Sequence, residues 1–436
     1  MNKISNKEFA KRRSNLMARI GDDAIAIIPS ADIRFRNRDA EFSFRQDSDF
    51  LYLTGFNEPE AVAVLVPGRK ESEYILFCRE KNPKTELWTG RMAGVEGAVD
   101  DYAADDAFPI EDIDEILPSL MENCSKVFYS VGNNPEFDKK VISWVNSLRT
   151  KVRSGVQAPH EFISLDIFLH GLRLFKSEME QNLMRDAAQV SVRAHQNAMK
   201  KCQVGMLEYE IEAEYLHEFK KSGMTTAYTS IVGGGENGCI LHYVDNNAEL
   251  KDNDLLLIDA GAENQGYASD ITRTFPVNGQ FTEAQRQLYQ VVLDAQYAAI
   301  DVAKPGSHWL DPHDAAVRVI TAGLLEHGLL SGGLEELISE TKYTPFYMHK
   351  TGHWLGLDVH DVGEYKVKDE WRELEPGMVL TVEPGLYISP SKDVDEKWWN
   401  IGIRIEDDVL ITQSGNEVLT ADLIKEIDDI ESLMAG

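Results

Sequence analysis

Four carboxylates in the second half of the chain follow apolar runs that predict strands. Asp259 and Asp270 lie in LLIDAGAENQGYASDITRTF, where two apolar runs flank the polar centre ENQG, a pattern typical of a hairpin. Glu383 ends the apolar run in VLTVEPGLY, and Glu406 follows the alternating isoleucines of IGIRIEDD. A single glutamate at a strand end is more often a surface residue. The four acids together favour a shared site that binds a cation.

The two aspartates are expected to face each other across the hairpin. A turn centred between Asn264 and Gln265 pairs Asp259 with Asp270. Directly opposed residues have Cβ atoms about 5 Å apart, and two like charges at that distance repel by roughly 3 kcal/mol at an effective dielectric near 20. A protonated aspartate, or an asymmetric turn that opens both side chains to solvent, would relieve this repulsion. A bound cation would relieve it as well.

Histidines add further ligand-type side chains to the same half. His242 lies in CILHY, and three more lie among glycines in MHKTGHWLGLDVHD: His349, His353 and His360. The four carboxylates with one histidine form an oxygen-rich set whose charge can hold two divalent ions, and carboxylates favour Mn²⁺ and similar ions. Two ions about 3.5 to 4 Å apart can share a water, lower its pKa and polarise a carbonyl. The set therefore predicts hydrolytic chemistry.

Composition bounds the kind of protein that carries this set. At 436 residues the chain is long enough for two domains. Its formal charge of −29, from 73 acidic and 44 basic side chains, disfavours a nucleic-acid partner or an anionic membrane surface. No apolar run approaches the ~18 residues of a membrane span, and MNKISNKEFAKRR lacks the apolar centre of a signal peptide. We expect a cytoplasmic protein whose scattered cysteines are buried thiols.

The first part of the chain is expected to form an α/β domain. Ser5 and Glu8 have the spacing of a capping box ahead of an amphipathic helix. Short apolar runs alternate with acidic, helix-like segments, at 24–28, 61–66, 74–78 and 127–131. A boundary near Gly171 gives an N-terminal domain of residues 1–172.

The remaining residues, 173–436, are expected to form an α+β domain. Ser177 and Glu180 form a second capping box, and another helix is expected from about residue 207 to 219. Strand-rich stretches surround a helical region from about 283 to 338, and they lie at 229–244, 254–276, 378–388 and 401–412. This order of elements predicts helices that frame a mainly antiparallel sheet.

The order of the candidate ligands, Asp, Asp, His, Glu, Glu, resembles that of the pita-bread metallopeptidases, which include methionine aminopeptidase, prolidase and aminopeptidase P. The stretches that carry the resemblance are IDAGAENQGYASDITRTFPV, HWLGLDVHDVG, LTVEPGLY and GIRIEDD. FRQDSDFLYLTGFNEPEAVAVL, residues 44–65, is similar to the N-terminal domain of bacterial aminopeptidase P, and ELWTGR, residues 86–91, to its tryptophan-bearing segment. The resemblance implies a pita-bread catalytic domain with a curved, mainly antiparallel sheet flanked by helices.

The same resemblance implies a metal site for two divalent ions, most simply Mn²⁺. Asp259 would be the bidentate ligand of one ion, and Asp270 and Glu406 would bridge the two. His353 and Glu383 would complete the second ion's ligands. All five positions match the family's pattern.

Catalysis in that family implies roles for further residues. A metal-bridging hydroxide attacks the carbonyl before a proline in the second position of a peptide, and Glu383 would manage its proton. His242 and His360 would stabilise the tetrahedral intermediate and the leaving group, and His349 would line the proline pocket.

An outer set and a neighbouring subunit also follow from the resemblance. Tyr228, Arg404 and Asp39 would form hydrogen bonds around the metals, and Trp88 would come from another subunit of a homo-oligomer, a tetramer or a dimer. Lys350 and Thr351 depart from the pattern, because the family has smaller or apolar residues there. They would either tune the pocket mouth or reflect neutral drift.

Other members of the fold remain as alternatives. A prolidase, which cuts only Xaa-Pro dipeptides, would keep every ligand. A creatinase-like hydrolase that works without metal, or a non-catalytic binding module, would have lost ligands that this chain keeps. Methionine aminopeptidase lacks an N-terminal domain of this size.

Overall fold

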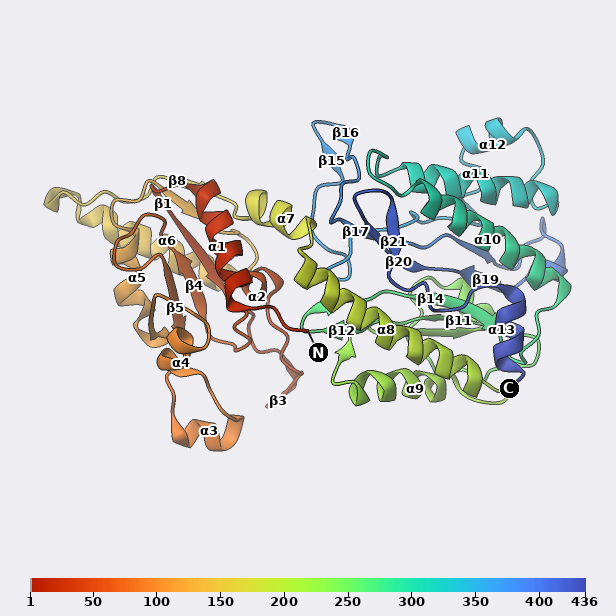
Figure 1. Ribbon diagram of the computed structural model, residues 1–436, viewed down its shortest axis with the longest axis horizontal. Helices are drawn as coiled ribbons and strands as arrows, with labels where there is room; N and C mark the ends of the chain where they lie inside the picture. The colour runs from red at the N-terminus through yellow and green to blue at the C-terminus, as the bar shows by residue number, and fades with distance from the viewer. Residues whose placement is uncertain (1) are drawn as a thin grey trace. The chain divides into compact units, whose positions relative to one another are not determined.

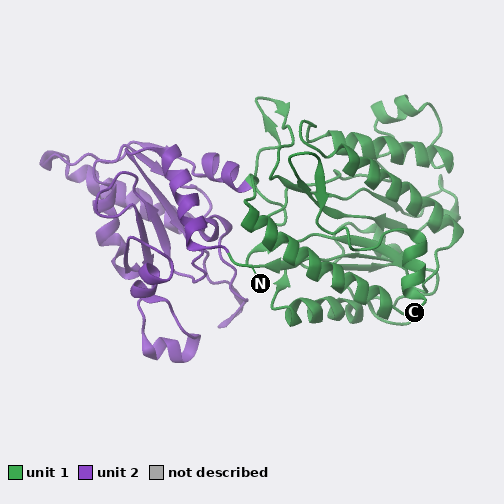
Figure 2. Cartoon of the chain, viewed as in Figure 1, with its two compact units in different colours: residues 1–3, 174–436 green, residues 4–173 purple. Residues whose placement is uncertain are grey.

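The computed structural model describes residues 2–436 and divides the chain into two compact units (Figure 2). The first unit is Ile4–Arg173. The second is Leu174–Gly436, joined by a short piece at the start of the chain. No helix among the described residues has the length and apolar character needed to cross a bilayer.

The first unit is built on a six-stranded mixed sheet in the order β6-β5-β4-β1-β7-β8. Its strands are β1 (Ala24–Pro29), β4 (Val62–Leu65), β5 (Tyr74–Cys78), β6 (Asp106–Pro109), β7 (Lys126–Phe128) and β8 (Glu161–Ile163). Its helices are α1 (Asn6–Ile20), α2 (Ser48–Thr54), α3 (Pro83–Thr89), α4 (Gly94–Asp100), α5 (Ile113–Met121), α6 (Pro135–Thr150) and α7 (Asp166–Leu174). The expected α/β fold of this part is confirmed.

Local signals explain where the elements of this unit begin and end. The Ser5 hydroxyl accepts the Glu8 N–H at 3.3 Å and starts α1, and Gly21, with φ of 81°, ends it. The expected strand at 127–131 is shorter than predicted, because β7 ends at Phe128. A small hairpin, β2 (Phe35–Asn37) and β3 (Ala40–Glu41), lies outside the main sheet.

The second unit places short antiparallel strands between two pairs of helices. Figure 1 shows α8 and α9 along one side of the strands and α10 and α11 along the other. The helices are α8 (Glu178–Lys201), α9 (Glu208–Lys221), α10 (Glu283–Val302), α11 (Asp311–Glu326), α12 (Leu334–Ser339) and α13 (Ile427–Met434). This is the expected pita-bread architecture.

The strands of this unit form several small sheets, and every strand pairing within them is antiparallel. They are β9 (Thr225–Thr226), β10 (Ile231–Gly234), β11 (Leu255–Asp259), β12 (Ala262–Asn264), β13 (Tyr267–Ala268), β14 (Thr272–Pro276), β15 (Lys366–Val367), β16 (Glu370–Trp371), β17 (Val379–Val382), β18 (Gly385–Ile388), β19 (Ile401–Arg404), β20 (Asp407–Ile411) and β21 (Asn416–Val418).

The register predicted for the hairpin is wrong, because the residue opposite Asp259 lies two positions further along the chain than predicted. Asp259 faces Thr272, not Asp270. The reason is the turn, whose central residues are Gln265 and Gly266 with φ of 53° and 90°, the conformation that tight hairpins favour. Because side chains alternate along a strand, Asp270 still lies on the same face as Asp259.

The strand expected over 229–244 is also shorter than predicted. Only β10 is extended, and Gly235–Cys239 forms a 3₁₀ turn. Gly235 has φ of 54°, and a side chain at Gly402 would lie 2.2 Å from the Gly238 carbonyl. The turn therefore packs directly on β19, which only glycine permits.

Candidate active site

One cavity in the second unit gathers ten of the twelve residues predicted from the sequence. Its volume is about 510 Å³. The predicted residues that line it are Tyr228, His242, Asp259, Asp270, His349, His353, His360, Glu383, Arg404 and Glu406. Asp39 and Trp88 belong to the first unit.

Strand ends deliver the acidic side chains, as the sequence indicated. Asp259 is the last residue of β11, and Asp270 precedes β14 by two residues. Glu383 directly follows β17, and Glu406 lies between β19 and β20. Each carboxylate is thus attached at the end of a strand whose other residues are buried in the core, which gives its backbone a fixed position.

A tyrosine joins the two aspartates, and an arginine binds one of them. The Tyr228 hydroxyl is within hydrogen-bond reach of Asp259, at 2.5 Å, and of Asp270. The Arg404 guanidinium donates to Asp259 at 2.6 Å. The side chains of the two aspartates are therefore linked through Tyr228, although the two residues are not directly opposite each other in the hairpin.

A histidine faces the other side of this acidic group. His353 Nε2 lies 3.4 Å from Asp270 and 3.7 Å from Glu383. Its Nδ1 is 3.0 Å from the Trp354 carbonyl, so Nδ1 carries a proton and Nε2 is the ring nitrogen that faces the carboxylates. One ligand atom each from Asp270, His353 and Glu406 lie within 4.8 Å of one another.

The electrostatics of the cluster show too little positive charge for its carboxylates. Burial, with neighbouring acids, raises the pKa of Glu383 to about 7 and that of Glu406 well above its ordinary value. Burial alone would raise the pKa of Asp270, but His353, Tyr228 and Arg404 together lower it below its ordinary value. Burial alone would lower the pKa of His353, but Asp270 and Glu383 raise it to about 9. This donor set fits divalent cations, which would supply the missing charge.

Comparison with known proteins agrees with this geometry. The model of metallopeptidase family M24 matches residues 182–413, and that of the aminopeptidase P N-terminal domain matches residues 9–129. The chain belongs to metallopeptidase family M24. It is 45% identical to the Xaa-Pro aminopeptidase of Escherichia coli (strain K12), over 100% of this chain and 99% of that protein.

Solved structures of related peptidases have the same fold as this chain. Pseudomonas aeruginosa aminopeptidase PepP is 56% identical with a TM-score of 0.99, covering 100% of this chain and 99% of that one. Zinc-substituted E. coli aminopeptidase P in complex with product is 45% identical with a TM-score of 0.97, covering 99% of each chain. Family and geometry together make this chain a metallopeptidase, and its cluster of carboxylates and histidine is a candidate site for divalent metal ions.

Two residues that sequence reasoning missed complete the metallopeptidase site. Thr272, fully buried, donates to Glu406 at 2.6 Å and accepts from Arg404 Nε at 3.0 Å. Tyr387 accepts from Arg404 at 3.0 Å and lies 2.9 Å from His349 Nε2. The only sequence signal for Thr272 is its position two residues after Asp270, on the same strand face.

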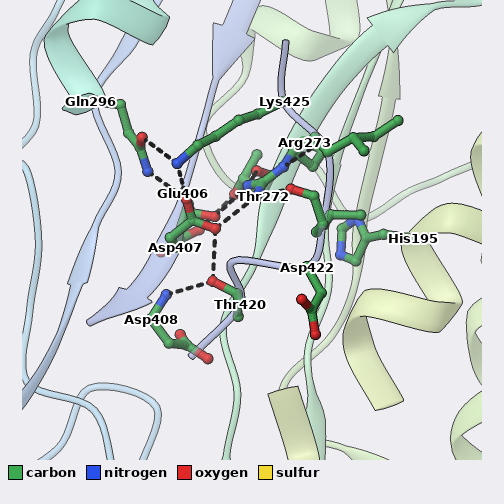
Figure 3. Close-up of polar contacts among 12 residues, drawn as sticks. His195, Thr272, Arg273, Gln296, Glu406, Asp407, Asp408, Thr420, Asp422 and Lys425 are labelled. Atoms are coloured by element: carbon green, nitrogen blue, oxygen red, sulfur yellow. Dashed lines mark hydrogen bonds and ion pairs between the residues drawn. The ribbon is translucent and has the colours of Figure 1, made fainter. Parts of the chain in front are cut away.

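A second ionic cluster lies behind the carboxylates, on neighbouring residues of the same strands. Figure 3 shows Arg273, Lys425 and Gln296 converging on Asp407. Asp407 accepts from all three, at 2.7 to 2.8 Å. Arg273 also donates to the backbone carbonyl of Glu406 at 2.6 Å. The cluster therefore fixes the backbone from which Glu406 enters the cavity.

Of the two residues that depart from the family pattern, one is exposed and one is buried. Lys350 is exposed and lines the cavity. Thr351 is 3% exposed, and its hydroxyl lies 2.9 Å from His313 Nδ1 and 2.5 Å from the Tyr347 hydroxyl. Thr351 is therefore part of a buried hydrogen-bonded group and not an exposed loop position.

Proposed function

We propose that this metallopeptidase is an Xaa-Pro aminopeptidase, which hydrolyses the bond between an N-terminal residue and a proline in second position. The carboxylate and histidine cluster on the cavity wall carries the proposal. Support comes from full-length relatives named Xaa-Pro aminopeptidase in E. coli and Haemophilus influenzae, 45% and 43% identical. Residues 1–172 would be the N-terminal domain and 173–436 the catalytic domain, consistent with the division at Arg173 and Leu174.

The metal ligands in this proposal are five residues of the cavity: Asp259, Asp270, His353, Glu383 and Glu406. Their oxygen-rich character supports Mn²⁺ as the ion. Two divalent ions bound there would supply an activated water and polarise the reacting carbonyl. Glu383, whose carboxylate would contact both the metal and its activated water, would also be the group that accepts and returns a proton.

Histidines around the cluster would bind the substrate. Burial lowers the pKa of His349 to about 4, so a neutral ring faces the cavity and suits the apolar ring of a proline. His242 and His360 are exposed on the cavity wall, where they can donate hydrogen bonds to the carbonyl oxygen and the leaving nitrogen. A proline in this position has no amide N–H that the site must satisfy.

The names of the full-length relatives, rather than charge, favour an aminopeptidase over an endopeptidase. Four carboxylates line the cavity, with Arg404 and Lys350 as its only lysine or arginine side chains among the described residues. Because two divalent ions would offset those carboxylates, the charge of the loaded cavity does not by itself select an N-terminal ammonium. Nothing in the site favours a prolidase, and the full-length relatives above are named Xaa-Pro aminopeptidase.

We further propose a homo-oligomer, a tetramer or a dimer, in which Trp88 reaches the active site of another copy. Trp88 and Leu87 on α3 are 86% and 82% exposed, and α3 has no buried residue. Such an apolar pair is typical of a contact surface. Asp39, exposed in the turn between β2 and β3, would join the outer hydrogen-bonded set around the metals.

A cytoplasmic location is supported by the free cysteines, Cys78, Cys124, Cys202 and Cys239.

The decisive experiment measures cleavage of Arg-Pro-Pro by chelator-treated protein with and without Mn²⁺. Turnover only after Mn²⁺ is added supports the proposal, and Arg-Ala-Ala is the control for proline selectivity. Cleavage of Ala-Pro without cleavage of Arg-Pro-Pro would instead indicate a prolidase. Equal rates with and without metal, after metal analysis shows complete stripping, would refute the two-metal mechanism.

The oligomer is tested separately with Trp88→Ala. Loss of activity without loss of folding is expected if another copy uses this side chain. A monomer in light scattering, or a variant with full activity, contradicts this part of the proposal and leaves the catalytic assignment intact.

A further inference from the structure

A buried ion pair lies close to the histidines of the cavity. Lys176 Nζ and Asp361 Oδ2 are 2.9 Å apart, and both side chains are 1% exposed. Lys176 lies just before α8, where its N–H donates to the Gly377 carbonyl at 2.8 Å and its own carbonyl accepts from Gln181 at 2.8 Å. The lysine is therefore fixed at both its backbone and its ammonium.

The pair is closely enclosed. A side chain at Gly356 would lie 2.2 Å from Asp361 Oδ2 and 2.8 Å from Lys176 Cε. A buried ion pair contributes little net stability, because the cost of removing both charges from water offsets their attraction. A contribution to stability is thus a weak explanation for a lysine in this position.

Hydrogen bonds connect the pair to two histidines of the site. The Asp361 N–H donates to the Trp354 carbonyl at 2.8 Å, and the same carbonyl accepts from His353 Nδ1 at 3.0 Å. His360, which directly precedes Asp361, packs its ring against His353 with centroids 4.3 Å apart. One carbonyl thus holds both the predicted metal ligand and the loop that carries His360.

We propose that Lys176 and Asp361 are positioning residues that hold the loop 354–361 closed, so that His353 and His360 keep their mutual geometry. The ammonium fixes the Asp361 side chain, the Asp361 backbone fixes the Trp354 carbonyl, and that carbonyl fixes the orientation of the His353 ring. The proposal rests on the proposed function for the role of the two histidines, although the geometry it describes exists without substrate or metal.

The test separates positioning from stability with a double variant, Lys176→Met with Asp361→Asn. Lys176→Met alone leaves a buried carboxylate unpaired, so its unfolding temperature should fall. The double variant removes both charges and should recover most of that loss. In the folded double variant, Mn²⁺ affinity by calorimetry and kcat at saturating Mn²⁺ should each fall by about 10-fold or more, as for other groups that orient a metal ligand.

A third measurement uses the metal-free protein. The proton on His353 Nδ1, bonded to the Trp354 carbonyl, should give a protected NMR signal in the wild type and a broadened or absent one in the double variant. Wild-type turnover of Arg-Pro-Pro is the reference. If the wild type has no turnover, the proposed function fails, and Mn²⁺ affinity and the NMR signal still test the positioning role.

A more exposed ion pair between Arg185 on α8 and Glu417 on β21 provides the control. Arg185 and Glu417 form an ion pair with side chains 33% and 40% exposed, and Arg185→Met with Glu417→Gln should change none of these readouts. Gly356→Ala is a second test, because the added methyl group would displace the Lys176 and Asp361 side chains without removing either charge. This variant tests the positioning role if the double variant does not fold. A folded double variant, or Gly356→Ala, with unchanged affinity, kcat and NMR signal overturns the proposal.

Discussion

Two ionic clusters in the second unit use neighbouring residues of the same strands and differ in how their charges are matched. Glu406 lines the cavity and accepts a hydrogen bond from the buried Thr272. Asp407 and Arg273, next to them in sequence, bond to each other in the cluster behind it (Figure 3). Burial would raise the pKa of Asp407, but Arg273 and Lys425 hold it at about 2. Burial raises the pKa of Glu406 well above its ordinary value.

The difference separates a structural cluster from a functional one. Behind the cavity, one carboxylate meets two cations and further donors, so the protein satisfies it completely. In the cavity, Arg404 and His353 face a larger group of carboxylates, and the protein leaves charge unmatched. Unmatched buried charge is costly, and its presence in a cavity indicates a site that a ligand completes.

The largest expected effect is on activity when a cavity carboxylate is removed. Glu406→Gln should reduce kcat/KM for Arg-Pro-Pro on the order of 10³-fold or more, because a ligand of both proposed ions is lost. The metal-free variant should unfold at the same temperature as the wild type or higher, because the amide removes the cost of burying an ionisable group beside other carboxylates, the cost that raises the pKa of Glu406. Glu417→Gln, at a pair that is partly exposed, is the control. If the Glu406→Gln variant were less stable than the wild type but fully active, the cavity cluster would be structural, like the cluster around Asp407.

The matched cluster should give the reverse result, a large loss of stability. Arg273→Met leaves Asp407 buried without its main cation, where both side chains are 0% exposed, and should lower the free energy of unfolding by about 3 to 5 kcal/mol. Urea titration measures it. Arg185→Met, at the partly exposed pair with Glu417, should cost less than about 1 kcal/mol. If Arg273→Met and Arg185→Met lowered the free energy of unfolding by similar amounts, burial would not explain the cost of breaking the Arg273–Asp407 pair.

The two clusters should also respond to pH in opposite directions. Glu383 and His353 have folded pKa values of about 7 and about 9, above their ordinary values. The stability they contribute to the metal-free protein is therefore present at low pH and is lost as the pH rises through those values. Asp407, with its pKa lowered to about 2, contributes stability above its ordinary pKa that is lost only in acid.

Metal reverses the first of these trends, because ions bind the deprotonated ligands. The gap in unfolding temperature between Mn²⁺-loaded and chelated protein should widen by several degrees between about pH 6 and pH 9. Calorimetric scans of both forms measure it. A gap that narrows over this range would show that the cavity groups do not bind the ion.

The smallest expected effect concerns the hydroxyl that joins Arg404 to Glu406. Thr272→Val keeps the shape and removes both hydrogen bonds, so Mn²⁺ affinity or kcat/KM should fall by about 10- to 100-fold, with about 1 kcal/mol lost in unfolding. Thr321→Val is the control, because Thr321 is equally buried but bonds only within α11, to the Val317 carbonyl. Equal kinetics in the two variants would show that Thr272 does not orient Glu406.

Much of the site could be predicted, partly from local pattern and partly from the resemblance to the family. An apolar run that leads to Asp259, Glu383 or Glu406 indicates both a strand and the residue at its end, whereas the roles of Tyr228 and Arg404 were inferred only from the resemblance. Ten predicted residues line one cavity. The register of the hairpin could not be predicted, because it depends on which two residues adopt positive φ. Gln265 does so here, and a glutamine gives no sign of it.

The residues of EDD at 406–408 show the limit most clearly. By type alone the three acids are equivalent, yet Glu406 enters the cavity, Asp407 binds Arg273 and Lys425, and Asp408 accepts the Asp270 N–H at 3.1 Å. Strand alternation separates Asp407 from its neighbours, but their partners lie far away in the chain.

The sequence by itself determined the fold class, because strand periodicity and strand ends are local properties, and its motifs determined the peptidase family and the side chains that line the cavity through their resemblance to that family. Only the tertiary structure decided which charges are matched. Whether a buried carboxylate is satisfied depends on cations and donors brought from distant segments, such as Lys425 and Gln296 for Asp407. The free energy of a buried charge is set by those neighbours, and no local pattern contains them.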